Sequence, residues 1–171
     1  MRATAAPARL RRALERAERQ FVARVVADGG IGSWRVAVDQ RLATALDVFS
    51  RRGTLSRQAA ADLLVALVDK PIRDRCWRLV ESRADVDWRA FWMHLSRRTL
   101  PPYRAEPLFL LAWSAWRRGD VKFARSAADA ALAQGPGHQA AAMLLALLSM
   151  QVEPGRLPSL GGRSGTSAGA S

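Results

Sequence analysis

From about residue 8 to residue 150, apolar side chains recur at helical intervals, and short breaks containing glycine or proline interrupt them. This pattern constrains the fold more than any other feature of the chain. Proline removes an amide donor and glycine readily adopts a left-handed conformation, so each break ends one helix and allows another to begin. We therefore predict an all-α fold of about eight helices without strands.

Residues suited to helix ends indicate where the individual helices begin and stop. Serine before an apolar run is an expected N-cap, glycine after one is an expected C-terminal stop, and proline is tolerated in a first turn. The expected helices are 8–27, one capped by Ser33 and stopped by Gly53, one capped by Ser56 and ended by Pro71, 72–82, one beginning near Asp85 or Asp87, and 108–118, 121–134 and 139–150.

The segment AWRRGDVKFARSAADAALAQGP, residues 115–136, has the most regular spacing in the chain. A Gly119-Asp120 turn precedes Ala124, Ala128 and Ala131, which are four and three residues apart. Residues at this spacing share one helix face, and alanine there leaves room for a second helix to approach closely. The segment therefore predicts a tight helical hairpin.

This hairpin resembles a unit of the tetratricopeptide repeat family, whose period is about 34 residues. The family's spacing has a weaker echo at Ala59, Leu63, Ala66 and Pro71. The resemblance implies an array of antiparallel hairpins in a right-handed superhelix, with units at 39–71, 72–104 and 105–137. The middle unit matches poorly, and an ordinary alanine-rich hairpin is the alternative. Residues that match the family's positions are Leu111, Ala112, Ala124, Ala131 and Pro136, with Ala128 where the family prefers an aromatic side chain.

The chain divides into three parts by composition. Residues 1–32 form a basic amphipathic helix with a glycine-rich hinge, and residues 33–150 form the helical-hairpin domain. Residues 151–171 are rich in glycine, serine and proline, and they offer little apolar surface to offset the entropy lost on ordering. We therefore predict that this tail is disordered.

A wider resemblance covers roughly residues 10–154. The ordered segments VDKPIRDRCW, FWMHLSRRTLPPYRAEPLFLLAWSAWRRGD and ALAQGPGHQAAAMLLALL resemble the C-terminal half of the actinobacterial family of domains of unknown function numbered 4192. The resemblance implies no particular activity, because the activity of this family is not established. It also implies an N-terminal α/β half that lies outside this chain.

Positive charge is concentrated at the N-terminus. The chain has 27 lysines and arginines against 15 acidic residues, and residues 1–27 hold seven arginines against two glutamates. A basic helix face of this kind can contact nucleic-acid phosphates, or it can be an ordinary solvated face. Nucleic-acid binding is therefore the alternative function, through Arg9, Arg11, Arg12, Arg16 and Arg19.

The leading functional prediction is a non-catalytic module that binds another protein. Helical-hairpin arrays form extended surfaces for partners, and basic side chains on them attract carboxylates. We expect an acidic protein partner at a surface formed by Trp116, Arg117, Arg118, Lys122 and Arg125.

The sequence contains no motif that predicts catalysis, a cofactor or a metal site. Cys76 is the only cysteine, so no disulfide within the chain and no site of several thiolates can form. His94 and His138 are the only histidines and lie in different expected hairpins. No apolar run approaches the roughly 20 residues that span a bilayer. We expect a cytoplasmic protein with no enzymatic activity, no cofactor and no membrane segment.

Two polar clusters are expected to be structural. The run GGIG at 29–32 lacks the lysine of a phosphate loop and predicts a hinge or turn. The charged cluster around Pro71 is expected to support the start of the following helix, because aspartate there complements the helix dipole. That cluster consists of Asp69, Arg73, Asp74 and Arg75.

Overall fold

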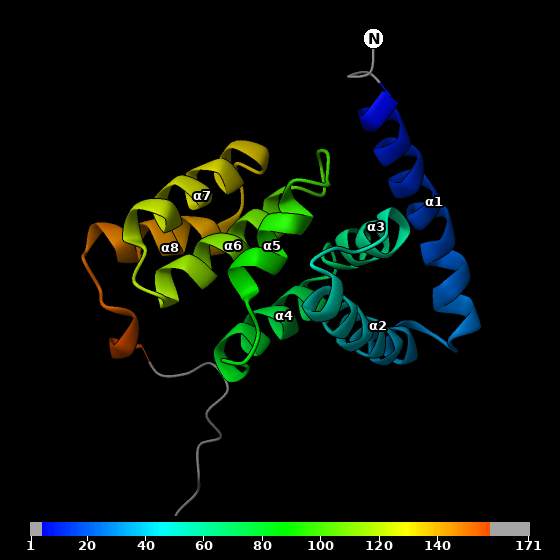
Figure 1. Ribbon diagram of the computed structural model, residues 1–171, viewed down its shortest axis with the longest axis horizontal. Helices are drawn as coiled ribbons and strands as arrows, with labels where there is room; N and C mark the ends of the chain where they lie inside the picture. The colour runs from blue at the N-terminus through cyan, green and yellow to red at the C-terminus, as the bar shows by residue number, and fades with distance from the viewer. Residues whose placement is uncertain (1–4, 158–171) are drawn as a thin grey trace, which may run out of the picture.

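The computed structural model describes residues 5–157, which form eight α-helices and one short 3-10 helix (Figure 1). The all-α prediction is confirmed for these residues. Most of the predicted disordered tail, residues 158–171, lies outside the described part of the chain. The helices are α1 (Ala5–Ala27), α2 (Ile31–Arg52), α3 (Arg57–Ala66), α4 (Lys70–Ser82), α5 (Trp88–Ser96), α6 (Ala105–Arg117), α7 (Val121–Gln134) and α8 (Gln139–Ser149), followed by the 3-10 helix Pro154–Arg156.

The helices gather at two ends of an elongated molecule (Figure 1). At one end α1 and α2 lean apart, with α3 packed mainly against α1. At the other end α6 packs against α7 and α5, and α8 packs against α7. Helix α4 connects the two ends through its contacts with α2 and α6.

Two helix starts carry the caps that the sequence predicts. The Ser56 hydroxyl accepts the Ala59 amide at 3.1 Å at the start of α3, and an Asp87 carboxylate oxygen accepts the Ala90 amide at 3.1 Å at the start of α5. Each cap satisfies an amide that has no partner within its own helix. Gly53 adopts φ 66° and ends α2 as predicted.

The predicted N-cap of the second helix was wrong. Helix α2 begins at Ile31, so Ser33 lies inside its first turn, and Gly30 occupies the N-cap position without a side-chain bond. Gly29 and Gly30 have φ values of 80° and 115°, which favour glycine. The chain therefore completes its turn within the two glycines and has no need of the serine.

The start of the sixth helix also differs from the prediction. Helix α6 begins at Ala105 rather than near Leu108, and Pro107 lies in its first turn. Proline costs little there because first-turn amides have no carbonyl partner within the helix.

The tight hairpin predicted for residues 105–137 is present as α6 and α7. Gly119 turns the chain with φ 82°, and Ala124, Ala128 and Ala131 have no exposed surface. A Cβ atom added to Gly135 would lie 3.3 Å from the Cβ of Ala105, so the two helices also approach closely at the far end of the hairpin. Small side chains therefore set the distance between α6 and α7.

The other two predicted units do not pair in the same way. In 39–71 the main contact of α3 is with α1 rather than with α2. In 72–104 the backbone of α4 approaches α6 and α2, and α5 packs against α6. Within these two predicted units the paired helices are therefore not each other's main neighbours, and a regular array of three sequential hairpins is not confirmed.

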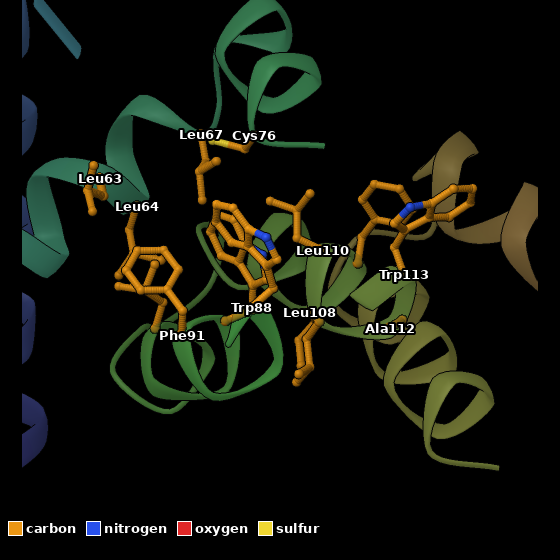
Figure 2. Packing of buried hydrophobic residues seen from close by; sticks show 14 of the residues in the cluster. Leu63, Leu64, Leu67, Cys76, Trp88, Phe91, Leu108, Leu110, Ala112 and Trp113 are labelled. Atoms are coloured by element: carbon orange, nitrogen blue, oxygen red, sulfur yellow. The ribbon is translucent and has the colours of Figure 1, made fainter. Parts of the chain in front are cut away.

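Aromatic and leucine side chains fill the space between α3, α5 and α6 (Figure 2). Leu64 of α3 lies beside Phe91 of α5, and Leu110 of α6 points into the space between the aromatic groups (Figure 2). The rings of Trp88 and Trp92 stack at 5.9 Å between centroids. All five side chains are at most 3% exposed, so this cluster belongs to the core.

A buried carboxylate ties α4 to α6. The Glu81 side chain is 2% exposed and lies 2.9 Å from the guanidinium of Arg117. It also accepts the Trp113 indole N–H at 2.5 Å. Both contacts link residues more than 30 positions apart, and they satisfy a charge that would be costly to bury alone.

The close packing of α7 leads to a stability prediction. Ala128→Trp should lower the free energy of unfolding by about 1–3 kcal/mol, because an indole cannot fit where the alanine has no exposed surface. Ala133→Trp is the matched control, since Ala133 is exposed on the same helix. Urea unfolding of both variants checks this, and equal stability of the two would contradict the packing of α7 described above.

Candidate functional site

Of the five residues predicted to bind a partner, Trp116 is buried, Arg117 is half-buried and the other three are exposed. Trp116 has no exposed area, so it is not available to a partner. Arg117 is half-buried and is bound to Glu81 and to the carbonyl of Pro154. Both side chains therefore hold the protein together, and the prediction that Trp116 lines a binding surface was wrong.

The remaining three residues of that surface are exposed. Arg118 lies 3.3 Å from an Asp87 oxygen, which takes up part of its charge. Lys122 forms no ion pair within residues 5–157, and Arg125 lies 3.5 Å from the Ser149 hydroxyl. Two free cations separated by one helical turn make a small patch, without an apolar centre of the kind that anchors protein partners.

The predicted nucleic-acid contacts lie together on α1. All five arginines are exposed, and none forms an ion pair within the described part of the chain. Four of them are spaced three, four and three residues apart, so they share one face of the helix, which we call the α1 arginine stripe. The stripe consists of Arg9, Arg12, Arg16 and Arg19, while Arg11 points to a different side.

A large groove lies between α1 and the pair α2 and α3. Its volume is about 780 Å³, within the range typical of ligand sites. Phe21 of α1 meets Trp34 of α2 edge to face at 4.9 Å between ring centroids, and both line the groove. Val48 and Leu63 add aliphatic walls. We call this feature the α1–α3 groove.

The charge around the α1–α3 groove is positive. Its lining includes three arginines and one aspartate. Arg24 of α1 lies 3.0 Å from Asp62 of α3 and so joins two walls, and Arg41 lies 3.3 Å from Asp28. Arg52 is exposed and forms no ion pair within residues 5–157. The groove therefore offers an apolar centre with a basic rim.

Sequence reasoning missed this groove because its residues come from three helices. Phe21 and Trp34 each lie among the apolar residues of an amphipathic helix, a position that suits a core residue equally well. The available signal was the glycine pair between two long helices, since such a turn lets α1 and α2 diverge. Helix α3, with only 10 residues, does not fill the space between them.

His138 forms a polar contact that the sequence did not reveal. Its Nδ1 accepts the Ala141 amide at 3.1 Å and so caps α8. Its Nε2 lies 3.0 Å from a carboxylate oxygen of Glu106 in α6. With Nδ1 accepting, Nε2 carries the proton and donates it to Glu106. This pair joins α6 to α8. The His138 side chain is buried, with 5% of its surface exposed.

His94 also has a structural contact. Its Nε2 accepts the backbone amide of Leu55 at 3.1 Å, which joins α5 to the segment before α3. Burial of the ring, and then the charge of Arg98, lower the pKa of His94 from its usual value. The ring is therefore neutral at pH 7 and works as an acceptor.

The charged cluster around Pro71 is structural, as predicted. Asp69 caps α4 by accepting the Ile72 amide at 3.2 Å. Its two oxygens also accept from Arg35 at 3.0 and 2.8 Å, so α4 is joined to α2. In residues 5–157 no group of three or more histidine, cysteine or acidic side chains is arranged to hold a metal ion. None of the described helices has the length and hydropathy needed to cross a membrane.

Comparison with known proteins identifies one family. The family model described as "Domain of unknown function (DUF4192)" matches residues 1–155, nearly the whole chain. No curated protein and no solved structure matches the chain.

The contact between His94 and Leu55 predicts a pH-dependent stability. Because the pKa of His94 is lowered in the folded state, the unfolded state binds the proton more tightly, and stability falls as the pH drops below about 6.5. The variant His94→Gln, whose amide oxygen can accept the same N–H, should lose this part of the pH dependence. Urea unfolding between pH 7.5 and 5.5 checks this. Parallel stability curves for the two proteins would show that His94 does not contribute.

Proposed function

This chain belongs to the DUF4192 family of domains of unknown function. From the surfaces of the chain itself, we propose that it is a non-catalytic module that binds a protein partner in the α1–α3 groove. The observation that supports this is an apolar groove of about 780 Å³ with a basic rim. The patch of exposed basic residues near α7, formed by Arg118, Lys122 and Arg125, lacks such an apolar centre.

The shape and charge of the groove favour one kind of occupant. An amphipathic helix binds by placing its apolar face in a hydrophobic groove. The lining is net positive, and its exposed Arg52, which forms no ion pair within residues 5–157, complements acidic side chains on the polar face of such a helix. We therefore propose an acidic amphipathic segment of another protein as the partner.

A peptide-display selection tests this proposal. Wild-type protein should enrich peptides that have apolar residues at helical spacing and a net negative charge. Thr44→Trp should lose this enrichment by about tenfold or more, since Thr44 is exposed and lines the groove, where an indole would block it.

Ala43→Trp provides the matched control for this selection. Ala43 is exposed on the same helix but does not line the groove, so this variant should select the same peptides as the wild type. If the two tryptophan variants behave alike, or if basic peptides are enriched, the proposed partner is wrong.

The α1 arginine stripe supports a second candidate function, binding to the phosphate backbone of nucleic acid. Four exposed arginines on one face, without ion pairs in residues 5–157, leave their charge available. The stripe has no aromatic side chain for stacking, so it favours contacts to phosphate without base recognition.

Salt dependence tests this second candidate. Affinity for a 20-base-pair duplex should fall by about 10² or more between 50 and 200 mM salt if four phosphates are contacted. Changing Arg9, Arg12, Arg16 and Arg19 to glutamine should remove most of the binding and of the salt dependence. An anisotropy titration measures both, and an unchanged titration with the fourfold variant would exclude the stripe.

A further inference from the structure

A second cavity lies where the start of α1 meets the start of α3 and the segment after α5, and it adjoins the α1–α3 groove at Leu55 and Ser56. Its volume is about 740 Å³. Three arginines line it, and we call it the arginine hollow: Arg57 is the first residue of α3, and Arg97 and Arg98 follow α5.

The arginine hollow has no negative charge in its lining. None of its lining residues is an aspartate or glutamate, and none of its three arginines forms an ion pair within residues 5–157. Elsewhere in this protein arginines meet carboxylates repeatedly, as Arg35 does with Asp69 and Arg117 with Glu81. Three cations around one cavity without a carboxylate leave a positive charge that an anionic ligand would neutralise.

Contacts within the protein hold the walls of the hollow in place. The guanidinium of Arg98 donates to the carbonyl of Leu55 at 3.0 Å, which joins the segment after α5 to the start of α3. The Tyr103 hydroxyl donates to the carboxylate of Glu18, which joins the same region to α1. The half-buried Arg98 is therefore positioned before any ligand arrives.

Apart from Ser56 and Thr99, the rest of the lining is aliphatic. Leu10, Leu55 and Leu100 face the hollow, and it has no aromatic side chain on which a nucleobase could stack. Arginine is well suited to phosphate because its planar donors match the phosphate oxygens. A ligand that suits both parts carries a phosphate on a small aliphatic body.

We propose that the arginine hollow binds a phosphate monoester of a small aliphatic molecule, with Arg57, Arg97 and Arg98 contacting the phosphate. This site is independent of the partner proposed for the α1–α3 groove. The phosphate can be carried by a free metabolite or by a lipid headgroup, because both present the same group on an aliphatic chain.

Titration calorimetry of the full chain at low ionic strength tests the site with butyl phosphate, and vesicle flotation tests it with phosphatidic acid in a neutral lipid. The variant Arg57→Gln with Arg97→Gln should lose about tenfold or more in affinity. Both residues are exposed, so the fold should tolerate their replacement. Arg78→Gln with Lys122→Gln removes the same charge from exposed positions outside the hollow and should bind within about twofold of wild type.

The two probes distinguish the sources. Binding of butyl phosphate that depends on Arg57 and Arg97 supports a free metabolite, and binding to vesicles alone with the same dependence supports a lipid headgroup. If neither probe binds, or if both double variants lose affinity equally, the hollow is not a phosphate site and the attraction reflects net charge alone.

Discussion

The burial of α6 is the constraint on which the rest of the structure depends. Every residue from Pro107 to Trp116 is buried, and such a helix must be covered on all sides. Its neighbours are α4, α5, α7 and α8, which contribute alanines on one side and aromatic rings on another. The one polar side chain in this run, Ser114, donates to the Leu110 carbonyl at 2.7 Å, so the helix carries no unsatisfied hydroxyl. The need to cover α6 on all sides therefore accounts for the positions of α4, α5, α7 and α8.

The end of the molecule away from α6 is packed differently. There α1 and α2, of 23 and 22 residues, diverge from the turn at Gly29 and Gly30, and the short α3 lies mainly against α1. Both large cavities are at this end, since each is lined by residues of α1 and by residues at or near α3. A well-packed end and an open end suit a division between scaffold and binding surface.

Arginine has two different roles in this protein, although the composition counts all its copies alike. Arg35, Arg24 and Arg117 join helices through carboxylates, and each pair links segments more than 30 residues apart along the chain. The arginines of the α1 stripe and two of those in the arginine hollow remain exposed. The net charge of +12 therefore does not show where the positive charge is exposed. Arginines paired with carboxylates add little positive surface, whereas those of the stripe and the hollow concentrate it.

The sequence by itself determined the number and approximate limits of the helices, because caps such as Ser56 and Asp87 and the turn at Gly119 act through neighbours a few residues away. It also identified the close packing in 105–137, since alanine spacing is a local property of one helix face. Only the tertiary structure decided that α3 lies on α1, that Trp116 is buried and that Arg57 shares a hollow with Arg98. Those relations depend on which apolar faces meet, and several pairings of eight amphipathic helices satisfy the same periodicity. The lowest free energy among them is set by packing across the whole chain rather than by any one segment.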